Sequence, residues 1–160
     1  MPGDYSQRLE QQKTKSETER IVRQTVQSYN INKFNMIKSV LIAGFGGFIG
    51  TALRLLISRY VQLNYTTVFP WSTFLINIAG SLLIGIIFGL TEKGDFLTPD
   101  WRLFLTVGLC GGFTTFSSLS NEAFMLLQNR EFFHFFMYFG LSFILGPVAV
   151  YAGRLIIKLI

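Results

Sequence analysis

Four long apolar runs follow one another along the chain, separated by short polar stretches. Each provides the roughly 20 mostly apolar residues that a helix needs to cross the hydrocarbon core of a bilayer. Trp71 and Trp101 fall at the boundaries of runs, where amphipathic rings prefer to lie. The pattern therefore predicts an all-α integral membrane protein with four transmembrane helices, at about Ile37–Ile57, Trp71–Leu90, Leu103–Leu127 and Phe132–Ile157.

A polar segment, residues 1–36, precedes the first apolar run, so we do not expect it to be a cleavable signal peptide. Ser16 and Glu19 have the spacing of a capping box, which predicts a short amphipathic helix near residues 17–28. That helix would lie on the membrane surface; a disordered tail is the second interpretation, and a start at Met36 is the third. We divide the chain into this tail and a transmembrane domain, residues 37–160.

Composition agrees with a membrane protein. Half of the residues are hydrophobic, only 14% are charged, and the mean hydropathy is +0.42. The net charge of +5 does not predict a nucleic-acid partner, because the basic residues do not cluster with aromatic ones. They are typical of topological anchors that contact anionic lipid. Cys110 is the single cysteine, which excludes an intrachain disulfide and any cysteine metal-ligand spacing.

Basic residues at the ends of the runs leave the orientation in the membrane open. One side holds Arg59 and Arg130, and the side of the tail holds Lys38, Lys93, Arg102 and Lys158. This small excess is near the balance that permits insertion both ways.

Small residues recur at helical spacing, as in Gly46-x-x-x-Gly50 and in Ser81, Gly85 and Gly89. Such faces allow close approach of two membrane helices. The stretch "GFGGFIG" lacks the spacing of a dinucleotide-binding loop, and no P-loop, HExxH or nucleophile-elbow motif occurs. ATP-driven or hydrolytic chemistry has no support, and we predict that the protein is not an enzyme.

Polar residues inside the apolar runs are costly to bury without a partner. Thr73 and Asn77 are four residues apart in the second run, as are Tyr138 and Ser142 in the fourth, so each pair shares a helix face. Hydrogen bonds that hold the bundle together and a polar pathway are both compatible with this spacing.

The stretch "LCGGFTTFSS" in the third run predicts a broken helix near residues 111–115. Gly111 and Gly112 lose backbone entropy in a helix, and Thr114 and Thr115 are β-branched. Backbone groups freed at membrane depth must be satisfied by protein, water or an ion. Broken helices coordinate ions in channels and transporters, and the hydroxyl groups add donors, so the pattern favours an ion site over a simple kink.

Two charged residues lie near or within the runs. Glu122 is the only carboxylate well inside one, and Arg54 near the end of the first run is the matching cation. A proton site and a pair of mutually satisfied or snorkelling charges are the two interpretations.

The motifs "GGFIGTALR", "STFLINIAGSLLIG" and "GLCGGFTTFSSLSNE" together resemble the small fluoride channels of the Fluc or CrcB family, over about residues 37–157. The resemblance implies an antiparallel, dual-topology homodimer with two fluoride pores in the cell membrane. It also implies a structural sodium ion at the dimer axis, held by backbone carbonyls of Gly111 and Thr114. Arg54 would attract anions at the vestibule. The pore residues implied are Asn77, Phe116, Ser142, Tyr138, Thr73 and Thr115.

Two positions depart from the family pattern. Leu119 stands where the family often has a second aromatic residue, and Gly146 where it often has a hydroxyl. The leading hypothesis is a passive channel that exports cytoplasmic fluoride down its electrochemical gradient. The alternatives are a small four-helix proton-coupled drug or cation exporter that uses Glu122, and a scaffold subunit that transports nothing.

Overall fold

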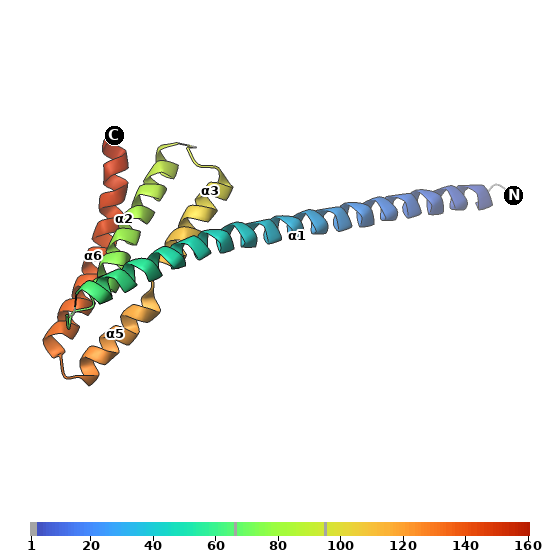
Figure 1. The fold of residues 1–160 in the computed structure, drawn as a ribbon. Coiled ribbons are helices and arrows are strands. Elements are labelled where there is room, and N and C mark those ends of the chain that lie inside the picture. The colour runs from blue at the N-terminus through green and yellow to red at the C-terminus, as the bar shows by residue number, and fades with distance from the viewer. Residues whose placement is uncertain (1–2, 66, 95) are drawn as a thin grey trace. The chain divides into compact units, whose positions relative to one another are not determined.

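The computed structural model describes residues 3–65, 67–94 and 96–160, and every regular element in these ranges is helical (Figure 1). The chain divides into two compact units, residues 1–40 and 41–160. The elements, in chain order, are α1 (Gly3–Asn64), α2 (Trp71–Lys93), α3 (Pro99–Leu103), the π-helix η1 (Phe104–Cys110), α4 (Gly111–Phe113), α5 (Phe116–Gln128) and α6 (Phe132–Leu159).

The first helix is longer than the sequence pattern predicts. It begins at Gly3 rather than near residue 17, so Ser16 and Glu19 do not mark a helix start. Neither glycine nor proline occurs between Asp4 and Ala43, so no residue in this stretch favours an interruption of the helix. In the N-terminal unit, Val22 and Val26 are exposed.

The four transmembrane helices predicted from the apolar runs are confirmed. Each is long and apolar enough to cross a membrane, and each extends a few residues beyond its run. The chain is therefore a multi-pass membrane protein, which in a bacterium places it in the cell membrane. The spans are Asn35–Asn64, Trp71–Lys93, Pro99–Gln128 and Phe132–Leu159.

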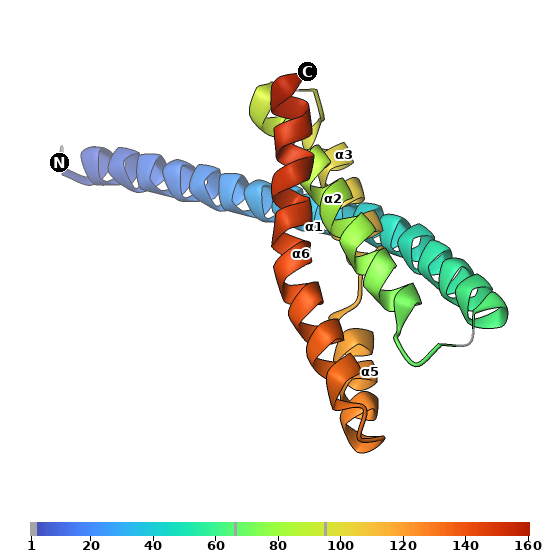
Figure 2. The same cartoon turned by 90° about the vertical axis from the view of Figure 1, so that its left-hand side faces the viewer.

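Helices α2 and α6 run side by side (Figure 1, Figure 2). Their backbones approach so closely that a Cβ atom at Gly85 would collide with the Val150 carbonyl, and one at Gly153 would lie 2.7 Å from the Ile86 nitrogen. A Cβ atom at Gly89 would lie 3.0 Å from the Ile157 side chain and 3.2 Å from Arg154 Cα. The predicted use of small residues in the second run for close packing is confirmed.

A second close approach joins α1 to the third span. A Cβ atom at Gly46 would lie 2.6 Å from the Phe104 carbonyl oxygen and 3.0 Å from Gly108 Cα. One turn further along α1, Gly50 lies against the Leu109 carbonyl, and Gly112 lies against the backbone of Gly47. Since all these neighbours are backbone atoms, no side-chain rotation could make room for a methyl group.

The third span leaves the helical conformation at two threonines. Gly111 is helical, with φ −62° and ψ −39°, and α4 ends at Phe113. Thr114 (φ −82°, ψ 156°) and Thr115 (φ −151°, ψ 116°) are extended, and α5 begins at Phe116. The two extended residues, called the interruption below, have φ values open to any residue. Of the neighbouring glycines, Gly112 therefore serves close packing against Gly47, whereas a Cβ atom at Gly111 would meet only the Thr106 carbonyl at 3.8 Å.

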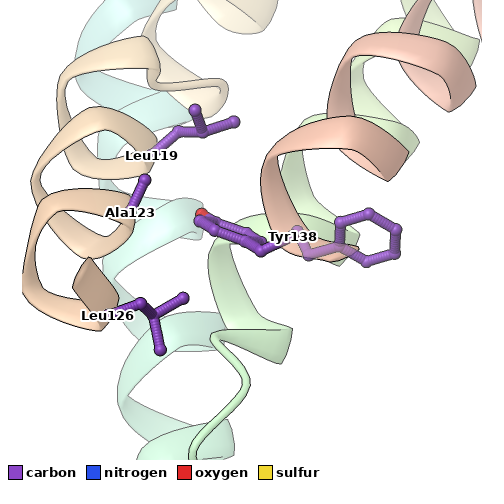
Figure 3. Packing of buried hydrophobic residues seen from close by; sticks show 5 residues of the cluster. Leu119, Ala123, Leu126 and Tyr138 are labelled. Carbon is purple, nitrogen blue, oxygen red and sulfur yellow. The ribbon is translucent and has the colours of Figure 1, made fainter. Parts of the chain in front are cut away.

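The buried cluster of the bundle lies where α5 and α6 meet α2 (Figure 3). Tyr138 is fully buried and reaches from α6 toward Leu119, Ala123 and Leu126 on α5. Phe74 of α2 completes the cluster. Leu119 is thus a packing residue in this structure, with 5% of its surface exposed.

Candidate functional site

Three polar side chains from three helices meet at one point, here called the Glu122 cluster. The Thr73 hydroxyl of α2 donates to Glu122 Oε1 at 2.7 Å, and the Tyr138 hydroxyl of α6 donates to Glu122 Oε2 at 2.6 Å. Both carboxylate oxygens of Glu122 therefore have a hydrogen-bond partner. The carboxylate is thereby satisfied inside an apolar bundle.

Arg54 and Glu122 have separate hydrogen-bond partners in the structure. Arg54 Nε donates to the carbonyl of Gly112 at 3.1 Å, and Thr51 Oγ1 donates to the same oxygen at 3.4 Å. Glu122 instead receives the two hydroxyl groups of its cluster. A mutual Glu122–Arg54 ion pair is therefore not the arrangement that the structure adopts.

The side-chain amide of Asn77 bonds to the interruption through both its oxygen and its nitrogen. The Thr115 N–H donates to Asn77 Oδ1 at 2.8 Å, and Asn77 Nδ2 donates to the Thr115 carbonyl at 3.2 Å. The side-chain amide therefore pairs with the backbone of a single residue as a neighbouring β-strand would. The two hydrogen bonds between Asn77 and Thr115 are called the clamp below. Asn77 lies one helical turn beyond Thr73 on α2, so the clamp lies next to the Glu122 cluster along the same helix face.

The interruption removes the helical donors of several carbonyls, among them those of Gly111 and Thr114. In a continuous α-helix, each N–H donates to the carbonyl four residues earlier. The Thr115 N–H would serve Gly111 but bonds to Asn77, and the Ser118 N–H would serve Thr114 but bonds to Thr115 Oγ1 at 3.2 Å. The two carbonyls concerned, of Gly111 and Thr114, are those that the family resemblance assigns to a cation.

Hydroxyl groups gather at the start of α5. Thr115 Oγ1 lies 3.1 Å from Ser117 Oγ, donates to Ser118 Oγ at 3.1 Å, and caps the helix by accepting the Ser118 N–H. The first turn of a helix carries partial positive charge from its unpaired N–H groups. The hydroxyl groups and the helix dipole at the start of α5 therefore favour a negatively charged group at this position.

The remaining predicted pore residues lie on α5 and α6. Phe116 is 69% exposed, and its ring meets Phe143 edge-on with centroids 6.5 Å apart. Ser142 donates to the Tyr138 carbonyl one turn earlier in α6, at 2.7 Å. At Gly146 a Cβ atom would lie 3.8 Å from Ser81 Oγ, so the missing hydroxyl leaves room beside that serine.

A pocket of about 510 Å³ opens beside the Glu122 cluster. Its lining includes two carboxylates, Glu122 and Glu131, together with Trp71 and Asn129. The Glu131 carboxylate faces His134 Nδ1 at 3.0 Å. The pocket reaches from Glu122 toward the end of the bundle where α1 ends and α2 begins, and most of its remaining lining is apolar.

The structure thus brings most of the predicted residues together in two neighbouring groups. Asn77, Thr115, Gly111 and Thr114 meet at the interruption, while Thr73 and Tyr138 meet at Glu122. Sequence reasoning missed Thr51, although its signal was present: it lies three residues before Arg54, on the same face of α1.

An interrupted transmembrane helix whose unpaired backbone groups bond to side chains of neighbouring helices is typical of membrane proteins that bind and pass ions. The profile of the family described as CrcB-like protein, Camphor Resistance (CrcB), matches residues 41–154. The chain belongs to this family. The match begins within α1, beyond the predicted tail.

Curated relatives carry the name fluoride-specific ion channel FluC. The relative from Flavobacterium psychrophilum is 44% identical over 126 residues, which cover 76% of this chain and 98% of the relative. Those from Phocaeicola vulgatus and Chlorobium luteolum are 44% and 43% identical, covering 73% and 75% of this chain and 96% and 92% of the relatives. These relatives are named ion channels, which are not enzymes.

Proposed function

We propose that this protein is a passive, fluoride-selective channel that exports cytoplasmic fluoride down its electrochemical gradient. The observation that carries the proposal is the clamp between Asn77 and the backbone of Thr115. It fixes an amide, hydroxyl groups and the start of α5 at one depth within an apolar bundle. The name shared by the curated relatives supports the choice of ion.

The chemistry of the interruption suits a small, strongly hydrated anion. Asn77 has two N–H groups on Nδ2 and uses one for Thr115, so the second is available to fluoride. The ring edge of Phe116 carries positive quadrupole charge. The Thr115 hydroxyl donates to Ser118 Oγ and the Ser142 hydroxyl to the Tyr138 carbonyl, so each would rotate toward the anion to act as a donor. Selectivity against chloride would follow from a narrow path and from the number of donors that replace water.

We assign a structural sodium ion to the carbonyls of Gly111 and Thr114. The residues fit such an ion, because both carbonyls have lost their helical donors and oxygen atoms are the ligands that hard cations prefer. Two carbonyls are too few for a full coordination shell, so a second copy of the chain supplies the rest. The sodium ion, when bound, contributes a fixed positive charge beside the path of the anion.

The assembly proposed with this ion is an antiparallel, dual-topology homodimer with two pores. In such a dimer the two interruptions face each other across the axis, so each contributes carbonyls to one ion. The role of Arg54 at the anion vestibule stays a prediction; its bond to the Gly112 carbonyl gives it a second task, which is to hold α4 against α1.

The first experiment reconstitutes the full chain in liposomes loaded with fluoride and follows efflux with a fluoride electrode, with chloride-loaded liposomes in parallel. Fast fluoride efflux without chloride efflux is expected. Phe116→Ile should reduce the fluoride rate, and Phe133→Ile should leave it unchanged, because Phe133 is equally exposed (72%) but lies at the start of α6. Folded protein without fluoride efflux, or with equal chloride efflux, would refute the proposal.

A proton-coupled exporter is the second candidate, because Glu122 lies beside a pocket and receives two hydrogen bonds. The two functions differ in their energy source. At pH 7.5 or above, where hydrogen fluoride is scarce, fluoride efflux through a channel does not depend on an imposed pH gradient. Transport that stops without the gradient, and is lost in Glu122→Gln, would favour the exporter.

A further inference from the structure

A second pocket of about 510 Å³ lies at the end of the bundle where α2 and α6 finish. Its lining combines three cations with one carboxylate, so two positive charges remain in excess. Its walls also include Gly89, Tyr151 and Leu155. We call it the basic pocket, and its charged residues are Glu92, Lys93, Arg154 and Lys158.

Two of the three cations of the basic pocket, Arg154 and Lys93, contact neighbouring groups of α2 and α6. Arg154 Nη1 lies 2.9 Å from Glu92 Oε1, and its guanidinium lies 5.5 Å from the centre of the Phe88 ring. Lys93 Nζ donates to the Ile157 carbonyl at 3.4 Å. Below the pocket, α2 and α6 are packed backbone against backbone at Gly85. The pocket is therefore preformed, with no helix movement needed to open it.

Directly below the basic pocket, one face of α6 is apolar and exposed. Its residues follow at spacings of four, three and four, so they form a single stripe along the helix. Tyr151 and Leu155 belong both to the stripe and to the pocket. The stripe consists of Ile144, Val148, Tyr151 and Leu155, which are between 38% and 67% exposed.

A cationic pocket above an apolar stripe has the polarity of a phospholipid. Both helices finish here, so the pocket lies at the level where hydrocarbon gives way to head groups. An anionic lipid phosphate would meet the surplus charge of Lys93 and Lys158, while an acyl chain would follow the stripe. A free anion would use the pocket alone and gain nothing from the stripe.

We propose that the basic pocket binds the phosphate of an anionic phospholipid. The proposal does not depend on the ion that the protein conducts. Each basic residue near a membrane surface contributes roughly 1 kcal/mol toward anionic lipid. Removing both lysine charges should therefore weaken the binding of phosphatidylglycerol by about thirtyfold relative to the parent chain.

The test titrates the detergent-solubilised full chain with phosphatidylglycerol or phosphatidylcholine and measures the lipid-bound fraction by native mass spectrometry. The parent chain should bind phosphatidylglycerol more tightly. The variant Lys93→Gln/Lys158→Gln should lose that preference, while Lys93→Arg/Lys158→Arg keeps it. Arg59→Gln removes one exposed cation from the opposite end of the bundle and should also keep it.

Three results would overturn the proposal. Equal affinity for the two lipids would exclude recognition of the phosphate's charge. An unchanged preference in Lys158→Gln and in the double variant would place the site elsewhere. If inorganic phosphate displaced phosphatidylglycerol at concentrations comparable to those of the lipid, the pocket would be a site for a free anion. Because Lys158 is exposed at the end of α6, the single variant is expected to fold.

Discussion

The crossing of α1 and the third span makes a sharp prediction for Gly46→Ala. The new Cβ atom would lie 2.6 Å from the Phe104 carbonyl oxygen and 3.0 Å from both Gly108 Cα and the Leu109 nitrogen. Overpacking of this kind costs about 1–3 kcal/mol. Because the new Cβ atom would meet three backbone atoms, we expect the clash in Gly46→Ala to cost about 3 kcal/mol, at the upper end of this range. The better helix propensity of alanine offsets about 1 kcal/mol of that cost.

Gly44 provides the matched control in the same helix. A Cβ atom there meets nothing within 4 Å in the protomer, so Gly44→Ala should gain helix propensity without a clash. The two variants should therefore differ in free energy of unfolding by about 3 kcal/mol. Because both replace glycine by alanine two residues apart, they differ mainly in what the methyl group meets.

The measurement is unfolding by sodium dodecyl sulfate in mixed micelles, followed by the fluorescence of Trp71 and Trp101. Gly46→Ala should unfold at a clearly lower detergent fraction than the parent, and Gly44→Ala at the same fraction or a higher one. Equal midpoints for the two variants would refute the inferred backbone contact. Gly140→Ala is a second control, since its Cβ atom also meets nothing within 4 Å.

Three further predictions test the site. Tyr138→Phe removes a donor from the half-buried Glu122 carboxylate and should lower the free energy of unfolding by about 1.5–3 kcal/mol in thermal unfolding. The exposed Tyr151→Phe should change it little, and equal effects of the two variants would refute the hydrogen bond to Glu122. Arg54→Gln should lower both the fluoride rate and the unfolding temperature, because the Gly112 carbonyl loses its charged donor; a lower rate alone would mean that Arg54 serves only the anion. Replacing sodium by N-methylglucamine should lower the unfolding temperature and the fluoride rate together, and potassium should not restore them if the carbonyl site is selective; indifference to sodium would remove the ion from the proposal.

The transmembrane helices could be predicted from the sequence because bilayer thickness dictates a run length that few other folds require. Their ends could not, since polar residues at the rim continue a helix as readily as they end it. Lys93 at the end of α2 is an example. The length of α1 was missed for a related reason: helix stop signals are local, and a long stretch without glycine or proline contains none.

The interruption shows a different limit. Gly111 and Gly112 contributed to the prediction of a break, but both stay helical, and the extended residues are the threonines that follow them. The Asn77 face was visible in the spacing, but its partner, the backbone of Thr115, is contributed by a segment 38 residues away. Periodicity identifies a polar face; it does not say which distant backbone group that face will meet.

The clamp places a requirement on the backbone of Thr115 that is separate from the requirement on its side chain. Asn77 bonds only to main-chain atoms, so the bond itself allows any residue at position 115 that has an N–H group, and it excludes proline. The threonine hydroxyl is committed separately, to the first turn of α5. Position 115 thus satisfies two independent constraints, one on the backbone and one on the side chain. A library of substitutions there should separate into variants that keep the fold and a smaller set that also keeps conduction.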